Sequence, residues 1–440
     1  GVLVEKSAKK SLGWAKPWAN RPSLRGPPDQ SSRETSIPQR LRHIATGSTV
    51  GPARSRQPSP RIKWLVAAQG NQRESVHPEL RLPPMLPFQL SLKPDASEAQ
   101  KRMCAYWEGE IIDRPCVSIR TAKEGMTPPW RSLVCREDFD FARTIAEFEQ
   151  WASAIFFGGE SMPALMPNWG PDQWAGFLGA NLLLVPEKDT SWAQPFVRDW
   201  DSLPPLAIDP DNRWWRATLA LTREAAAVCD GKFILSTIDT HSNLDCLAAL
   251  RGPEKLCLDL LECPESVLRA LEQVDALYEG VYDAIYQAGR MQEFGTTSWL
   301  DMWSPRRTQA VQCDFCCMIS KAHFRRFALP YLEREISRLD HAVYHMDGPG
   351  QIRHLDDLLS LKRLHTIQWV PGAGQPSAPA WVPLLQRIQK AGKAVQVLVT
   401  IDEVPVVFPQ LEPEKTFYWV LDSPSQAQAR QLLKWLQTHM

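Results

Sequence analysis

The residue types that could carry chemistry gather in three short polar clusters, each after a short apolar run. The clusters are 239–245 (Asp-Thr-His-Ser-Asn-Leu-Asp), 345–350 (His-Met-Asp-Gly-Pro-Gly) and 401–403 (Ile-Asp-Glu). Imidazole and carboxylate groups held close together can bind a divalent metal or exchange protons with a substrate. We therefore predict an enzyme whose active site is assembled from the ends of several strands.

His345 and Asp347 are the strongest candidates for the centre of such a site. Residues two apart in a strand share a face, so both side chains can enter one cavity. The glycines that follow allow a ligand to approach the backbone closely. We predict that the pair binds a metal with Glu403 as a third ligand, or acts as a metal-free acid/base pair. The structural alternative is that the pair only satisfies backbone groups of the Gly-Pro-Gly turn.

Asp239 and His241 form the second candidate pair. Asp239 directly ends an apolar run, so its carboxylate is predicted to enter the pocket, and His241 would orient a substrate or move a proton. The competing interpretation is that Ser242 or Asn243 caps a helix that begins there, with Asp245 adding favourable charge to its N-terminus.

Residues 313–317 (Cys-Asp-Phe-Cys-Cys) suggest a metal site at first sight. A zinc site of this kind usually needs about four ligands, often two C-x₂-C pairs, and the sequence has no second pair. We predict that these thiols belong to the core. Asp314 is an acid inside an otherwise apolar run, so we predict that it lines the substrate cavity.

A further set of residues is predicted to contact the substrate. Aromatic side chains at or near predicted strand ends could wall an apolar cavity for a flat ligand, and arginines could bind a carboxylate. The set comprises Trp299, Trp303, Tyr344, Trp369, Arg120 and Arg251.

The elements that must position these residues alternate between short β-branched runs and longer helical patterns. The predicted strands are 116–120, 232–238, 296–303, 342–346, 365–370 and 394–400, and the predicted helices are about 209–231, 264–288, 320–339 (kinked at Pro330) and 379–391. This alternation is typical of a parallel α/β sheet. Because no G-x-G-x-x-G follows an early strand, we favour a (β/α)₈ TIM barrel over a dinucleotide-binding fold, with the site at the C-terminal ends of its strands.

The charge of the chain divides it into two parts. Residues 1–84 hold 15 Lys+Arg and 5 Asp+Glu, a net charge of +10, so residues 85–440 hold 35 and 45, a net charge of −10. Residues 1–84 are rich in Pro, Arg, Ser and Gln, which predicts a disordered basic extension. This extension is either a passive tail or a misassigned stretch upstream of Met85, or a basic arm or targeting segment. Residues 85–440 are predicted to form the barrel.

The cysteine spacing and the absence of long apolar runs indicate a cellular compartment and a class of partner. The ten cysteines all lie between Cys104 and Cys317 without the spacing of a disulfide framework, and no apolar run is long enough to cross a membrane. We therefore expect a cytoplasmic protein that acts on a small molecule, with neither nucleic acid nor membrane as its partner. Its surface helices could support a homodimer.

Several segments resemble the uroporphyrinogen decarboxylase superfamily over roughly residues 97–438. They are Tyr106-Trp-Glu-Gly-Glu110, Leu247-Ala-Ala-Leu-Arg-Gly252, Phe327-Ala-Leu-Pro-Tyr331, Tyr344-His-Met-Asp-Gly-Pro-Gly350 and Ile367-Gln-Trp-Val-Pro-Gly372. The resemblance is nearest to a poorly characterised decarboxylase-like branch, and it implies a (β/α)₈ barrel. It also implies one of two chemistries, a cofactor-free decarboxylation or a corrinoid-dependent methyl transfer at zinc.

The chain departs from both patterns. The strand at 114–120 (Arg-Pro-Cys-Val-Ser-Ile-Arg) lacks the R-Q-A-G-R motif of the decarboxylases. In the methyltransferases a His-x-Cys holds zinc, and here His345 matches the histidine whereas Asp347 replaces the cysteine. We therefore expect a methyltransferase-like enzyme whose ligands are rich in oxygen, with zinc or another divalent metal and a corrinoid brought by a partner protein.

Two alternatives stay open. One is a cofactor-free decarboxylase of a carboxylated, tetrapyrrole-like substrate, in which Arg120 and Arg251 supply positive charge and Asp239 or His345 the proton. The other is a catalytically inactive barrel that binds a ligand.

Overall fold

The computed structural model describes residues 88–422 and 424–440, so the predictions for residues 1–84 lie outside the described part of the chain. The strands are β1 Cys116–Ala122, β2 Ile155–Gly159, β3 Ala164–Leu165, β4 Asn181–Val185, β5 Thr190–Gln194, β6 Ile234–Leu235, β7 Thr308–Gln312, β8 His341–Asp347, β9 Leu364–Val370, β10 Ala394–Val399 and β11 Thr416–Val420. The α-helices are α1 Ala96–Trp107, α2 Phe141–Ser153, α3 Gln173–Phe177, α4 Arg213–Ala226, α5 Asn243–Arg251, α6 Pro253–Glu262, α7 Pro264–Ala288, α8 Met291–Phe294, α9 Lys321–Phe327, α10 Leu329–Ser337, α11 Leu355–Leu359, α12 Val382–Lys390, α13 Val404–Val407 and α14 Gln426–Thr438.

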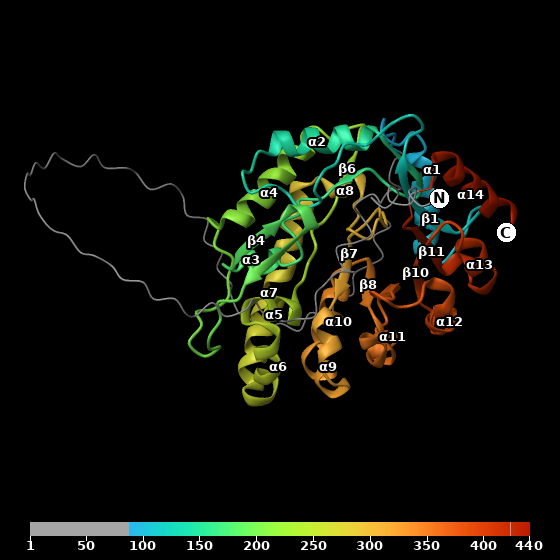
Figure 1. Ribbon diagram of the computed structural model, residues 1–440. Coiled ribbons are helices and arrows are strands. Elements are labelled where there is room, and N and C mark those ends of the chain that lie inside the picture. Colours follow the sequence, from blue (N-terminus) through green and yellow to red (C-terminus); the bar gives the residue numbers. More distant parts are fainter. Residues whose placement is uncertain (1–87, 423) are drawn as a thin grey trace, which may run out of the picture. The chain divides into compact units, whose positions relative to one another are not determined.

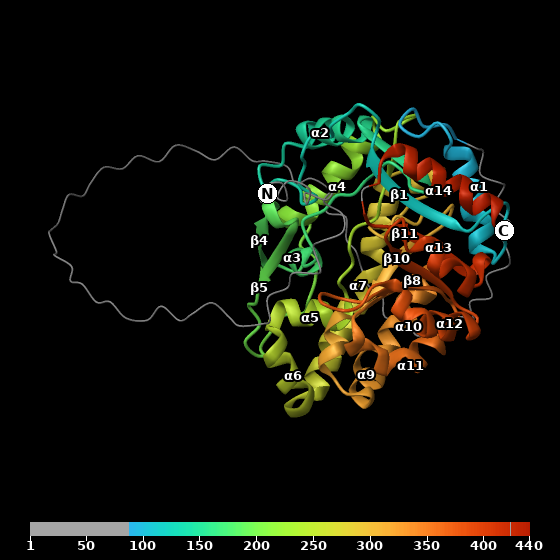
Figure 2. The ribbon, with the colours of Figure 1, turned by 45° about the vertical axis from the view of Figure 1, so that its right-hand side comes forward.

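A seven-stranded sheet in the order β2-β1-β11-β10-β9-β8-β7 is the centre of the fold. All of its neighbours pair in parallel except β1 with β2. Parallel strands need helical crossovers, and these supply α10, α12 and α14, which pack against β7, β10 and β1. Figure 2 shows the same helices beside the sheet from a second direction. The predicted α/β class with a mainly parallel sheet is confirmed.

Backbone hydrogen bonds continue the strand pairing beyond the edges of this sheet. β3 pairs in parallel with β6, and Ser236 then forms a parallel bridge with Thr297. The amide of Thr237 donates to the carbonyl of Thr297 at 2.9 Å. On the far side, the side-chain amide of Gln309 in β7 donates to the carbonyl of Ile238 at 2.6 Å. The segment 234–238 is therefore tied both to β3 and to β7.

The sequence pattern located most long elements correctly. The helix predicted at 264–288 is α7, whose buried stripe includes Val267, Leu271, Val274 and Ile285. The helix predicted at 320–339 is interrupted at Ala328, two residues before Pro330, and forms α9 and α10. A proline removes a backbone donor and clashes with the preceding turn, which explains the interruption.

Two of the predicted strands differ from the structure, and several strands were not predicted. Residues 296–303, predicted as a strand, form only isolated bridges, and residues 232–238 form the two-residue strand β6. The strands β2, β3, β4, β5, β7 and β11 were not predicted from the sequence. β7 (Thr-Gln-Ala-Val-Gln) carries two glutamines, and its interior polar side chains hide the apolar run that marks a buried parallel strand.

Candidate functional site: a carboxylate and imidazole cluster at the ends of β7 and β8

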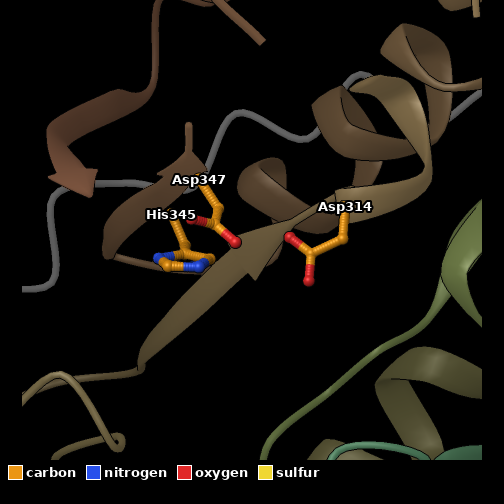
Figure 3. A group of neighbouring side chains, drawn as sticks. All are labelled: Asp314, His345 and Asp347. Carbon is orange, nitrogen blue, oxygen red and sulfur yellow. The ribbon is translucent and has the colours of Figure 1, made fainter. Parts of the chain in front are cut away.

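Asp314, His345 and Asp347 come together at the C-terminal edge of the sheet. Each offers one possible ligand atom, and these three atoms all lie within 4.8 Å of one another. Figure 3 shows the carboxylates of Asp314 and Asp347 beside the imidazole of His345. The imidazole is fully buried, whereas both carboxylates are partly exposed. The predicted pairing of His345 and Asp347 on one strand is thus joined by a third group.

The strands explain this placement. His345 and Asp347 are the fifth and seventh residues of β8, so both side chains lie on one face. Asp314 follows the adjacent parallel strand β7, one residue after Cys313, and opens a short 3₁₀ turn, Asp314–Met318. Because Gln312 is in register with His345, the end of β7 brings Asp314 next to the end of β8.

The backbone of Asp314 is held by a second carboxylate. Asp245, in the first turn of α5, accepts hydrogen bonds from the backbone amides of Asp314 and Phe315, both at 2.8 Å. Asp245 therefore fixes the start of the 3₁₀ turn. From the sequence, Asp245 was expected only to place a favourable negative charge at the N-terminus of a helix. In the structure it also makes this contact between two loops.

A row of buried amides orients the imidazole of His345. Nδ1 of His345 lies 2.5 Å from Oε1 of Gln368, whose Nε2 donates to Oε1 of Gln396 at 2.8 Å. Nε2 of Gln396 in turn donates to the carbonyl of Leu300 at 2.7 Å. Since this carbonyl can only accept, it fixes the orientation of both amides, and Oε1 of Gln368 must accept a hydrogen bond from the protonated Nδ1 of His345. Nε2 is then the ring nitrogen able to bind a metal, as is usual for metal-binding histidines.

Asp239 and His241 lie near this cluster, as predicted from the sequence. Both side chains are buried, and Nε2 of His241 is 3.5 Å from Oδ2 of Asp239. Nε2 of Gln312 donates to Oδ1 of Asp239 at 3.1 Å. Burial, and then repulsion by Asp314 and Asp245, raises the pKa of Asp239 well above its usual range. Asp239 is therefore a buried carboxyl group that tends to keep its proton.

Trp299 joins the two groups. Its ring packs edge-on against the imidazole of His345, with ring centroids 4.9 Å apart, and it forms a side-chain hydrogen bond to Asp239. The prediction that Trp299 lies beside the site agrees with this position. Trp299 therefore lies between the carboxyl group of Asp239 and the imidazole of His345.

Glu335 supports the site from behind. It lies on α10, is buried, and its Oε1 accepts hydrogen bonds from Ser242 at 2.6 Å and Asn243 at 3.2 Å. Asn243 has a φ of +52°, a conformation uncommon for a residue with a side chain, and it also donates to the carbonyl of Gln312 at 3.0 Å. Burial raises the pKa of Glu335 to about 7. Ser242 and Asn243 thus connect the 239–245 loop to α10, in addition to marking the start of α5.

Glu403 does not belong to the cluster. Its carboxylate accepts a hydrogen bond from the backbone amide of Thr400 at 2.9 Å and lies at the start of α13. The group of described residues that could hold a metal ion contains Asp314 instead. The prediction of Glu403 as a third ligand is therefore corrected to Asp314, because the loop after β10 turns the Glu403 side chain back onto its own backbone.

Three of the predicted aromatic residues pack elsewhere. Trp369 contacts Trp381, with centroids 4.8 Å apart, because it follows Gln368 in β9 and so lies on the opposite face. Tyr344 lies on the opposite face of β8 from His345, and its hydroxyl donates to Gln351 at 3.0 Å. Trp303 is buried against Phe88 in a separate core cluster. Among the predicted wall residues, only Trp299 contacts the site.

The two predicted arginines are both engaged by carboxylates. Arg120 forms an ion pair with Asp301 and donates to Oγ of Ser161 at 2.9 Å. Arg251 forms a bidentate pair with Asp259 at 2.6 and 3.0 Å, at the end of α5. Both pairs tie segments of the fold together, which accounts for these arginines without a substrate.

The sequence analysis missed the glutamines of the site. Gln312, Gln368 and Gln396 lie in one register row with His345 across four adjacent strands, and all are buried. Oε1 of Gln312 is buried and accepts no hydrogen bond from the described residues. The available signal was a single amide in the middle of an apolar run, as in Ala-Val-Gln-Val-Leu-Val, because a buried amide needs a partner.

The cysteines follow the core prediction in part. Cys313 and Cys316 are fully buried, as expected, whereas Cys317 is exposed.

None of the described helices combines the length and apolar character that crossing a membrane requires.

Comparison with known proteins identifies a similar fold. No protein-family model matches the sequence, and no curated protein matches it. The chain is similar in structure to a methyltransferase from Methanosarcina mazei, with a TM-score of 0.51 and 10% identity over 77% of this chain and 98% of that chain. At this identity the similarity concerns the fold.

Proposed function

We propose that this chain is a metal-dependent, methyltransferase-like enzyme of the uroporphyrinogen decarboxylase superfamily that acts on a small molecule. The observation that carries the proposal is the convergence of Asp314, His345 and Asp347 within 4.8 Å of one another at a strand edge. The fold shared with a methyltransferase supports the reaction class. The ties from segment 234–238 to β3 and β7 support a sheet closed into a barrel.

The donor set suits a divalent cation. Two carboxylates and one imidazole favour zinc or a harder divalent metal over a thiolate-type centre. The tautomer fixed by Gln368 leaves Nε2 of His345 as the nitrogen ligand. A cation at this position would act as a Lewis acid that lowers the pKa of a bound acceptor group.

The neighbouring residues have roles of their own. The raised pKa of Asp239 favours its protonated form, which can donate a proton, with His241 at 3.5 Å as the exchange partner. Gln312 presents an acceptor oxygen to the substrate. Trp299 excludes water between Asp239 and His345. The methyl donor would be a corrinoid carried by a partner protein.

The structure favours this proposal over decarboxylation. A decarboxylase needs cations beside the leaving carboxylate, and both predicted arginines are paired with Asp301 and Asp259. A cluster of acids would repel such a substrate unless a metal neutralises it. We therefore propose the methyltransferase-like reaction for this chain.

Equilibrium dialysis against Zn²⁺ and Co²⁺, followed by elemental analysis, tests the metal site. We expect one ion per chain in the wild type, and loss of that ion in Asp314→Ala and in Asp347→Ala. Glu403→Ala is the matched control, because the sequence suggested Glu403 as a metal ligand, whereas its carboxylate lies outside the cluster. A metal-free wild type, or equal loss in Glu403→Ala, would contradict the site.

A reaction assay tests the chemistry separately. The metal-loaded protein is mixed with methylcobalamin and a panel of small thiols, and demethylation of the corrinoid is followed by its absorbance. We expect turnover that is lost in Asp314→Ala and kept in Glu403→Ala. Metal binding without demethylation of methylcobalamin would leave the metal site standing and refute the methyltransferase-like reaction.

A further inference from the structure

A second cavity lies at the opposite edge of the same sheet. It has a volume of about 380 Å³ and is lined by the first residues of three adjacent strands, His341 of β8, Leu364 of β9 and Ala394 of β10. The Asp314, His345 and Asp347 cluster lies at the other ends of these strands. The volume falls in the range of small-molecule sites.

The charges around this cavity are mainly positive. Four cations line it, and the two acids that line it are Asp340 and Glu414. The cations are Lys362, Arg363, Lys393 and Lys415. The excess of two positive charges contrasts with the net charge of −10 carried by residues 85–440. A basic cavity in an acidic protein is a local feature that attracts anions.

Part of this charge has a structural role. Nζ of Lys393 is buried and donates to the carbonyls of Leu361 and Leu364, each at 2.7 Å. Lys415 pairs with Glu412. These contacts account for two of the four cations.

The other two cations have no such explanation. Lys362 and Arg363 form no ion pair in the described part of the chain, and Arg363 donates only to the carbonyl of Leu339, at 2.9 Å. The remaining guanidinium donors of Arg363 and the ammonium of Lys362 are therefore available beside the cavity. An arginine and a lysine of this kind are the usual partners of phosphate and carboxylate groups.

One wall of the cavity is aromatic and contains a stacked pair of rings. The ring of Trp107 stacks on His341 with centroids 4.5 Å apart and an interplanar angle of 4°. Nδ1 of His341 is 2.8 Å from Oγ of Ser304. Burial lowers the pKa of His341 to about 3 and that of His365 to about 4, so both imidazoles are neutral near pH 7.

We propose that this cavity binds a small polyanion bearing phosphate or carboxylate groups, with Lys362 and Arg363 as its charged contacts. The proposal is independent of the function assigned to the other edge of the sheet. Phosphate and carboxylate share the chemistry that these two side chains recognise, and the probes below distinguish them.

Isothermal titration of the full chain with sodium pyrophosphate and with citrate, at low ionic strength, tests the proposal. We expect at least one of the two to bind with a Kd at or below about 1 mM and to weaken as salt is added. Putrescine, a dication of small size, should not bind at this site. Binding of pyrophosphate alone assigns a phosphate site, and binding of citrate alone assigns a carboxylate site.

Two variants locate the binding. Lys362→Glu/Arg363→Glu and the neutral Lys362→Gln/Arg363→Gln should each weaken binding by roughly tenfold or more. Lys188→Glu/Lys255→Glu is the charge-matched control on exposed positions of other elements and should bind as the wild type does. The far-UV circular dichroism spectrum and the thermal unfolding midpoint of all variants should match those of the wild type, which shows that they are folded. Absence of binding for both anions, or equal weakening in the control, would overturn the proposal.

Discussion

Strand β8 carries two histidines, and their surroundings differ completely. His341 begins the strand, stacks on Trp107 and faces a basic cavity, whereas His345 lies four residues later beside two carboxylates. Both lie on the same face of the strand by their spacing. The residue type therefore does not decide the chemistry. The neighbouring strands do, because they place cations at one edge of the sheet and acids at the other.

The largest expected effect is a difference in metal binding between the two histidines. His345→Ala should weaken Zn²⁺ binding by about a thousandfold, since a metal site with only three protein ligands loses a large share of its binding energy with any one of them. His341→Ala should keep the metal, because its ring faces the other cavity. Competition with a chromogenic chelator measures both. Equal losses in the two variants would mean that His345 has no special role.

The next largest effect is the pH dependence of the free energy of unfolding, which we expect to differ between the two edges of the sheet. The pKa of Glu335 is about 7 in the folded chain, above the usual 4.5, so the folded state keeps a proton that the unfolded state releases. The resulting stabilisation is full below pH 4.5 and is lost as the pH rises through 7. We expect the free energy of unfolding to fall by roughly 3 kcal/mol across this window.

Glu335→Gln should remove this part of the pH dependence, because glutamine can still accept from Ser242 and Asn243 but cannot titrate. Urea unfolding at several pH values measures it. His341 and His365, whose pKa values are lowered, titrate only in acid and provide the contrast at the other edge. An unchanged slope between pH 5 and 8 in the variant would refute the assignment.

The smallest expected effect tests the amide row. Gln368→Leu should weaken Zn²⁺ binding by about 10- to 100-fold, because it removes the acceptor that fixes the tautomer of His345. Gln309→Leu is the matched control, since Gln309 is also a buried amide but bonds Thr237, Ile238 and Thr240 instead. Full metal affinity in Gln368→Leu would show that the row has only a packing role.

Some of the site could be predicted from sequence because it depends on local geometry. The two-residue spacing of His345 and Asp347 fixes a shared face in any strand, and Asp239 could be assigned because it directly ends an apolar run. The third ligand could not be found in this way. Glu403 and Asp314 are both acids after strands, and only strand order decides that β7, which precedes Asp314, lies next to β8.

The positions of the aromatic residues could also be predicted only in part from the sequence. Trp299 and Trp303 both seemed to be wall residues, yet Trp299 contacts His345 whereas Trp303 packs against Phe88. Trp369 was wrongly predicted to line the site. Its neighbour Gln368 occupies the inner face of β9, so Trp369 lies on the opposite face. A glutamine in an apolar strand does not reveal which face of the sheet its side chain lies on, since a buried amide can find a hydrogen-bond partner on either face.

The amino-acid order by itself determined the α/β class, the long helix α7, the break near Pro330 and the pairing of His345 with Asp347, because each follows from short-range periodicity or sterics. Tertiary structure decided that Asp314 completes the cluster, that a row of glutamines orients the imidazole, and that cations collect at the far edge of the sheet. These features join strands that are distant in the chain, and the register between such strands is set by packing of the whole sheet.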